Sequence, residues 1–158
     1  MSPPGTKPVA SNRKARHDYS ILDTYEAGIQ LVGSEVKSIR DGKVQMADAY
    51  ASVERGQLFL YNVHVAPYGF AHGFGAHDPD RSRKLLMHRS EIDRIGARVA
   101  QERLTLVPLE LYFKDGRVKV TLALAKGRTH ADKRSAMAER DAKKEMAKAL
   151  GRSAKGMD

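Results

Sequence analysis

The chain has 158 residues, which is enough for one domain with its own hydrophobic core. Its 28 Lys and Arg residues against 19 Asp and Glu residues give a formal net charge of +9, which favours a polyanionic partner, nucleic acid before an acidic membrane. The absence of Cys excludes disulfide scaffolds, cysteine-based zinc modules, iron–sulfur clusters and cysteine nucleophiles, and no apolar run is long enough to span a membrane.

Composition divides the chain into three parts. Residues 1–16 are polar and Pro-rich, lack the apolar run of a signal peptide, and predict a short disordered basic arm. Residues 17–125 contain the folded body. Residues 126–158 hold ten basic and five acidic residues but no Val, Ile, Phe or Tyr, so this basic tail cannot bury enough apolar surface to order itself. We expect a cytoplasmic protein.

Within the body, apolar and polar residues alternate with a period of two, which predicts strands. In chain order the predicted strands are 19–25, 28–31, 50–53, 58–65, 84–87, 104–107, 109–113 and 118–124. Turn residues at 54–56 and 114–116 join neighbouring runs into hairpins, and the Asp-Gly step of the second turn is the stronger signal. Val107 and Leu122 are expected to face the interior.

Two body helices are predicted, at 34–40 and 90–101, and Ser90 and Asp93 of the second have the spacing of a capping box. The body has no alternation of strands with helices that would indicate a parallel sheet. The sequence therefore predicts a mainly β fold: a small antiparallel barrel of oligonucleotide-binding type, with about six strands and two to three flanking helices.

The tail has a helical pattern of its own. Residues 133–150 include five alanines and no Gly, Pro or β-branched residue, so their helix propensity is high. Apolar side chains are too few to pack such a helix, and an unpacked helix of this length is marginal in water. We expect the tail to be disordered when free and helical against an anionic surface.

Several local patterns suggest chemistry but lack the context for it. His72 and His77 are two ligands short of a metal site, and Gly73-x-Gly75 neither follows a parallel strand nor opens a helix. His17 and Asp18 would point to opposite faces of a strand, so they could not act together on one phosphate. We therefore expect no catalysis, no metal and no cofactor. The cations of residues 12–17 fit either a solvated arm or a clamp on RNA phosphates.

Five sequence blocks resemble the SsrA-binding protein family, also called small protein B or SmpB. They are NRKARHDY (12–19), EAGIQLVGSEVKSIR (26–40), DPDRSRKLLMH (78–88), LTLVPLELYF (104–113), and a last group formed by residues 119–120, 124–127 and 132–134. The blocks occur in the order and spacing of the family. Each block alone is moderately specific, and the five together are very specific.

The resemblance implies a partner and a process. Members of the family have an oligonucleotide-binding-like barrel and bind the tRNA-like domain of transfer-messenger RNA around its D-loop. Protein and RNA together rescue stalled ribosomes by trans-translation. The basic tail is implied to enter the decoding centre and the vacant mRNA channel of the small subunit as a helix. We expect no membrane partner and a monomer when free.

The resemblance also implies two sets of site residues. Those expected to bind RNA are Asn12, Arg13, Lys14, Arg16, His17, Tyr19, Glu26, Lys37, Arg40, Arg83, Lys84, Leu86 and Lys119. Those expected to act in the tail on the ribosome are Gly127, Arg128, His130, Asp132, Lys133, Arg134, Arg140, Lys143 and Lys144. Leu86 fits either an unstacked base or the core. The chain departs from the family where Ala131 replaces a common His, with His130 one place earlier.

Two other functions fit the same sequence. A general translation factor or ribosomal protein with this barrel would bind ribosomal RNA without transfer-messenger RNA. A small RNA-processing enzyme would cleave structured RNA with turnover. Sequencing the RNA that the protein recovers from a cell extract would distinguish the first from the family function, and a cleavage assay would detect the second.

Overall fold

The computed structural model describes residues 6–68, 76–128 and 144. Its elements in chain order are β1 (Thr6–Ser11), α1 (Arg13–Asp18), β2 (Tyr19–Ile29), α2 (Gly33–Arg40), β3 (Val44–Gln45), β4 (Tyr50–Glu54), β5 (Gln57–Tyr61), β6 (His64–Val65), β7 (Arg83–Leu86), α3 (Arg89–Glu102), β8 (Thr105–Lys114) and β9 (Arg117–Gly127). The chain divides after Gly127 into a body and a C-terminal unit.

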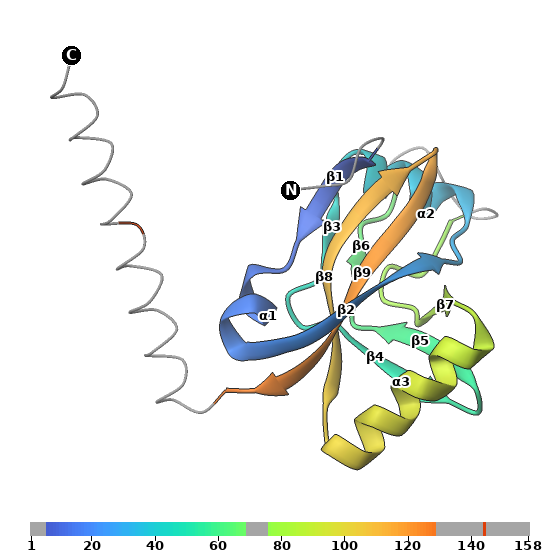
Figure 1. Cartoon of the computed structure of the whole chain (residues 1–158). Helices are drawn as coiled ribbons and strands as arrows, with labels where there is room; N and C mark the ends of the chain where they lie inside the picture. The colour runs from blue at the N-terminus through green and yellow to red at the C-terminus, as the bar shows by residue number, and fades with distance from the viewer. Residues whose placement is uncertain (1–5, 69–75, 129–143, 145–158) are drawn as a thin grey trace, which may run out of the picture. The chain divides into compact units, whose positions relative to one another are not determined.

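Seven of these strands form one antiparallel sheet that closes on itself (Figure 1). The strand order is β1-β8-β4-β5-β7-β2-β9, and β9 pairs with β8 as well as with β2, so the strands from β8 to β9 make a closed barrel. β1 pairs with the second half of β8, beyond the point where β4 pairs with it. β3 and β6 form a separate two-stranded sheet. The predicted mainly β antiparallel barrel with flanking helices is confirmed.

Side chains alternate between the two faces of each strand, and those that point inward fill the interior of the barrel. Leu106, Val120, Leu122 and Leu124 are at most 2% exposed and belong to the main core. Both predicted hairpins are present, and the two central residues of each turn have positive φ angles, Asp115 at 52° and Gly116 at 77° in the second. Such turns match the right-handed twist of the strands that they join.

The runs predicted separately at 104–107 and 109–113 are one strand, β8, with a bulge after Pro108. Proline has no N–H for the ladder, so a strand accommodates it at a bulge. Asn12 bonds to this irregularity: its backbone N–H donates to the Leu109 carbonyl over 2.8 Å, and its side-chain amide donates to the Pro108 carbonyl over 3.0 Å. The bulge thereby fastens the N-terminal segment to the barrel.

The prediction of a disordered arm at residues 1–16 is wrong for the part that is described. Thr6–Ser11 pairs with β8, and residues 13–16 belong to α1. Asn12 is 2% exposed, and its side-chain oxygen caps α1 by accepting from the backbone N–H of Ala15 over 3.0 Å. Polar composition pointed to disorder, but ladder hydrogen bonds and a helix cap order a segment that buries few apolar side chains.

Helix α1 covers the outer face of the barrel where β8 meets β9. Ala15 packs there with Val107, Leu109, Ala123 and Ala125, in a cluster separate from the main core. Val107 lies opposite Ala123 and so faces α1 rather than the interior. The prediction for Val107 is therefore wrong by one position, because neighbouring strand residues point to opposite faces, while the prediction for Leu122 is confirmed.

Helix α3 lies across one end of the barrel, beside β4 and β5 (Figure 1). Its residues Ile92 and Ile95 are buried in the main core. The helix begins at Arg89 after His88 and has no side-chain cap, so the capping box predicted from Ser90 and Asp93 does not form. Among the described residues, no helix combines the length and the apolar character needed to cross a bilayer.

Candidate nucleic-acid interface

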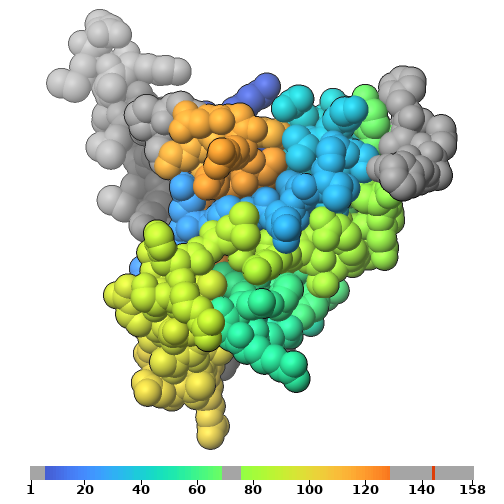
Figure 2. All heavy atoms as spheres, turned by 90° about the vertical axis from the view of Figure 1, so that its right-hand side faces the viewer, coloured from blue at the N-terminus to red at the C-terminus, as the bar shows by residue number. Residues whose placement is uncertain are grey.

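Three of the residues expected to bind RNA, Glu26, Leu86 and Lys119, come together around Gly28 of β2. Gly28 lies opposite Leu86 on β7 and opposite Lys119 on β9. Paired residues on antiparallel strands point to the same face, and Glu26 is two positions from Gly28, so all three side chains share the outer face. Figure 2 views the side of the body where β7, the end of β2 and the β8–β9 hairpin adjoin.

A groove of about 430 Å³ lies over this junction. Its lining comprises Gly28, Ile29, Leu31, Val36, Leu86, Gly116, Arg117, Val118 and Lys119. Leu86 is 51% exposed, so it does not belong to the core. A Cβ atom added at Gly28 would come within 3.3 Å of the Leu86 Cβ, so glycine allows Leu86 to lie close over β2. An apolar side chain beside two cations suits an unstacked base whose phosphates face the cations.

Glu26 is held in this region by β8. The Tyr112 hydroxyl donates to Glu26 Oε2, and Lys114 Nζ lies 3.2 Å from Glu26 Oε1. The hydrogen bond from Tyr112, with help from Lys114 and Lys119, lowers the pKa of Glu26 below its ordinary value, although burial opposes the shift. Burial and the adjacent carboxylate raise the pKa of Tyr112. Near neutral pH, Glu26 is therefore an ionised acceptor and Tyr112 a neutral donor.

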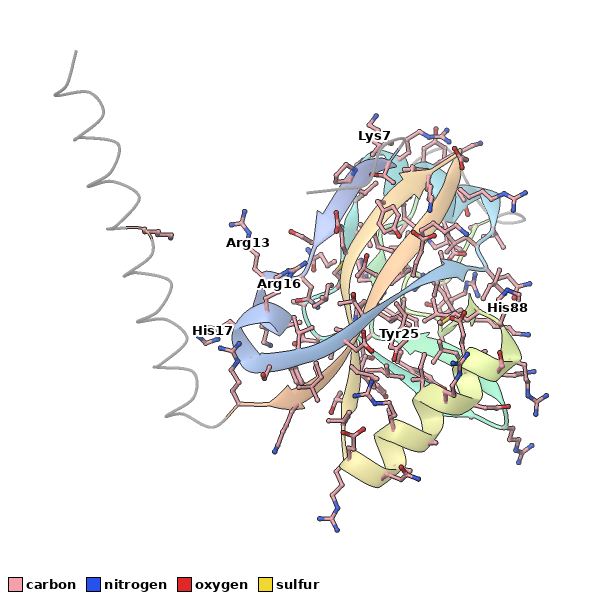
Figure 3. All side chains as sticks on the ribbon, in the orientation of Figure 1. Lys7, Arg13, Arg16, His17, Tyr25 and His88 are labelled. Carbon is pink, nitrogen blue, oxygen red and sulfur yellow. The ribbon has the colours of Figure 1, made fainter. Side chains whose placement is uncertain are left out.

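A second group of expected RNA-binding residues lies on and beside α1. Arg13, Lys14 and Arg16 are exposed, and Lys14 Nζ is 2.7 Å from an exposed Asp48 carboxylate. Arg13 and His17 extend away from the barrel (Figure 3). A helix anchored to the barrel, rather than a solvated arm, therefore presents these cations. Tyr19 packs against the cluster beneath α1 and is half-buried.

The expectation that His17 and Asp18 point to opposite faces of a strand is wrong. Both residues lie on α1 and not on a strand, and His17 Nδ1 is 2.9 Å from Asp18 Oδ1. The contact joins two neighbouring residues of α1.

The structure contradicts the expectation that Arg83 contacts RNA. Its side chain is fully buried, and its Nε donates to Glu35 Oε2 over 2.7 Å. Its terminal nitrogens donate to the carbonyls of Val63, Arg81 and Pro79 over 2.7, 3.0 and 3.0 Å. A guanidinium bonded in this way ties β7 to α2 and to the preceding loop, and it cannot reach a phosphate.

Asn12 is also too buried for the RNA contact expected of it. Besides capping α1 and contacting the bulge of β8, its amide donates to the Met46 carbonyl over 2.9 Å. Its role in the structure is to hold α1 in place.

Three further expected residues remain within reach of a ligand. Lys84 is half-buried on β7, two positions from Leu86 and thus on the same face. Lys37 and Arg40 are exposed on α2. Lys37 Nζ lies 5.3 Å from the centre of the Tyr68 ring, and the Arg40 guanidinium carbon lies 5.4 Å from the centre of the Phe113 ring.

The expected set missed Tyr112, Lys114 and Arg117. Tyr112 and Lys114 lie opposite Lys119 and Arg117 in the β8–β9 hairpin. Extending the alternation from Lys119 across the predicted Asp-Gly turn would have placed all of them on one face. The hydrogen bonds to Glu26 could not have been found in this way, because they depend on β2 lying beside β9.

No group of three or more His, Asp or Glu side chains that could hold a metal ion occurs in the part of the chain that the structure describes. His77 is hydrogen-bonded to the Ser34 hydroxyl at 2.8 Å and to the Val65 carbonyl at 3.0 Å. His72 and the Gly73-x-Gly75 step lie outside the described residues.

The expected tail residues are mostly beyond what the structure describes. Gly127 ends β9 opposite Tyr19, Arg128 follows it, and Lys144 is exposed with helical backbone. The other expected tail residues lie outside the described part: His130, Asp132, Lys133, Arg134, Arg140 and Lys143.

Comparisons with known proteins agree with one another. A family model described as "SmpB protein" matches residues 9–152. The SsrA-binding protein of Mycolicibacterium gilvum (strain PYR-GCK) is 57% identical over 150 residues, which cover 94% of this chain and 90% of that protein. The SsrA-binding protein of Salinispora arenicola (strain CNS-205) is 53% identical over 154 residues, which cover 98% of this chain and 96% of that protein. A solved structure described as "tmRNA-SmpB: a journey to the center of the bacterial ribosome" matches with a TM-score of 0.65 and 48% identity, covering 83% of this chain and 95% of the other. This chain belongs to the SmpB protein family.

Proposed function

We propose that this protein binds the tRNA-like domain of transfer-messenger RNA and acts with it in trans-translation, the rescue of stalled ribosomes. The observation that carries the proposal is the outer-face groove lined by the exposed Leu86 and the half-buried Lys119, with an ionised Glu26 beside it on β2. The similar proteins are named for binding SsrA RNA, and the similar solved structure is described as containing tmRNA and SmpB.

Two kinds of contact follow from the side chains. Lys119 and Arg117 in the groove, with the exposed cations of α1, bind phosphates and set the orientation of the RNA. Leu86 packs against a base that has left its stack, as the unpaired nucleotides of RNA loops can. Binding of this kind needs no bond to be made or broken, so we expect no turnover of RNA and no cofactor.

The tail has a separate role in this proposal. Residues 128–158 enter the decoding centre and the vacant mRNA channel and become helical there, because the anionic channel supplies the charge neutralisation that the free tail lacks. An intact message would occupy the same channel, which makes the tail a sensor of missing mRNA. Action on ribosomes places the protein in the cytoplasm, and we expect a monomer when it is free.

The test is recovery of RNA from a cell extract with the tagged full-length protein, followed by sequencing. We expect transfer-messenger RNA to be enriched, and Lys119→Glu to abolish the enrichment. Arg55→Glu makes the same charge change at an exposed position on the β4–β5 turn, and it should leave the enrichment intact. Recovery of ribosomal RNA alone would refute the proposal in favour of a general ribosome-binding factor.

A further inference from the structure

Tyr112 contacts Glu26, and neither side chain is among those that line the groove. Tyr112 is 5% exposed, on β8, and β9 lies between it and β2. In the β8–β9 register it lies opposite Lys119, and its hydroxyl extends past that strand to Glu26 Oε2. A buried tyrosine that spans a neighbouring strand to bond an exposed carboxylate can influence a ligand only through that carboxylate.

The Glu26 carboxylate is held from two directions. Tyr112 donates to Oε2, and Lys114 Nζ lies 3.2 Å from Oε1 and 3.4 Å from Oε2. A carboxylate offers about four lone-pair sites, so acceptor capacity remains on the side away from β8. The charged groups facing it are Lys114 from β8 and Lys119 from β9, and its side chain is 39% exposed.

The charge of Glu26 limits what it can bind. A carboxylate repels phosphate oxygens, so its favourable partners on RNA are the N–H groups on base edges. Those groups are accessible where a loop leaves its bases unpaired. Leu86 supplies the adjoining apolar surface against which such a base could lie.

We infer that Tyr112 is a positioning residue: its hydroxyl fixes the Glu26 carboxylate on the outer face beside the groove, two positions along β2 from Gly28, where Glu26 accepts a hydrogen bond from an N–H group of an unpaired RNA base. Fixing the carboxylate before binding removes the entropic cost of ordering it in the complex. This inference rests on the proposed function and adds to it the base-recognising role of the site.

A double-mutant cycle tests the inference with the isolated tRNA-like domain as ligand. Tyr112→Phe keeps the ring and removes the hydroxyl, and it should raise Kd by about tenfold, the typical effect of losing one hydrogen bond to a charged group. Glu26→Ala should weaken binding at least as much. The double variant should bind no more weakly than Glu26→Ala alone, because Tyr112 acts through Glu26.

Tyr61→Phe is the matched control. The Tyr61 hydroxyl also donates to a carboxylate, that of Glu54 at 2.8 Å, but this pair lies on the β4–β5 hairpin and outside the groove. Its removal should leave the affinity for RNA unchanged.

Carboxyl titration by NMR gives a second readout that loss of packing alone would not move. Tyr112→Phe should raise the pKa of Glu26 toward its ordinary value, and binding by this variant should fail at a higher pH than binding by the wild type. If Tyr112→Phe does not fold, Lys114→Gln takes its place in the titration, because it removes the other bond to the carboxylate and should raise the same pKa.

Equal affinities of Tyr112→Phe and the wild type, additive losses in the double variant, or an unchanged pKa of Glu26 would each overturn the inference. These outcomes leave the proposed function standing, because the wild type still binds the RNA. Failure of the wild type to bind the tRNA-like domain would instead refute the proposed function itself.

Discussion

Replacing Glu35 by Gln should destabilise the body strongly. The Glu35 carboxylate is fully buried and accepts hydrogen bonds from Arg83 Nε at 2.7 Å, from Arg81 Nη2 at 2.5 Å and Nε at 3.0 Å, and from the Val32 backbone N–H at 3.0 Å. The substitution keeps the shape of the side chain and removes its charge. The Arg83 guanidinium then stays fully buried beside a neutral amide.

The size of the effect follows from that burial. Removing one partner of a buried ion pair costs roughly 3–5 kcal/mol, because the other charge is left uncompensated. Each kcal/mol lowers the melting temperature of a chain of this size by about 2–4 °C, so we expect a fall of about 6–20 °C. Thermal melts and urea titrations followed by circular dichroism would measure it.

Glu54→Gln is the control for this substitution. Glu54 is exposed and bonded to the Tyr61 hydroxyl, so its loss of charge should change the stability by no more than about 0.5 kcal/mol. A Glu35→Gln variant that melts with the wild type would refute the claim that this cluster holds α2 and β7 together. Below its melting temperature the variant should bind RNA normally, because the cluster is structural.

Four further results are expected. Burial alone would raise the pKa of Glu35, but hydrogen bonds, led by that from Arg81, lower it below the ordinary value of 4.5. The stabilisation from ionised Glu35 is therefore fully present above pH 4.5 and is lost as the pH falls through the lowered pKa of the folded protein. Glu35→Gln should flatten the dependence of the urea midpoint on pH in acid. In binding assays, log affinity for RNA should fall linearly with log salt by roughly 0.7–0.9 per phosphate contacted, and Lys119→Glu should reduce that slope; an affinity independent of salt would contradict the interface. Leu122→Asp should abolish the folded circular dichroism spectrum by burying an unpaired charge, whereas a normal melt would show that Leu122 does not face the core. A protein ending at Arg128 keeps all of β9, so its Kd for transfer-messenger RNA should stay within about twofold of that of the full-length protein. It should nevertheless fail to tag nascent chains on stalled ribosomes, and normal tagging would refute the sensor role of the tail.

Alternation was sufficient to predict the hairpins but not the faces of every strand. In β7, Leu85 and Leu86 are adjacent apolar residues, so the sequence alone allows either of them to face inward. The structure buries Leu85, which places Arg83 inside with it and leaves Leu86 exposed. Arg83 is tolerated there because Glu35, 48 residues earlier in the chain, supplies the compensating charge. A pattern confined to a few residues cannot contain that partner.

The N-terminal segment was misjudged for the same reason. Its order depends on Asn12, whose amide bonds carbonyls 34 and 96 residues away in the sequence. Composition describes only how much apolar surface a segment can bury, and here backbone pairing with β8 supplies most of the attachment. The cations expected on a disordered arm are consequently on a fixed helix, where Arg13, Lys14 and Arg16 are exposed.

The bulge after Pro108 connects these observations to the function. It provides the carbonyls that hold Asn12, and Asn12 caps α1, whose Ala15 packs on the outer face of β8 and β9. Further along the same two strands, Tyr112 bonds to Glu26, and Lys119 lines the groove. Two strands thus fix, relative to each other, both groups of side chains that we propose to face RNA. We therefore expect RNA binding through the body to require little ordering of these side chains.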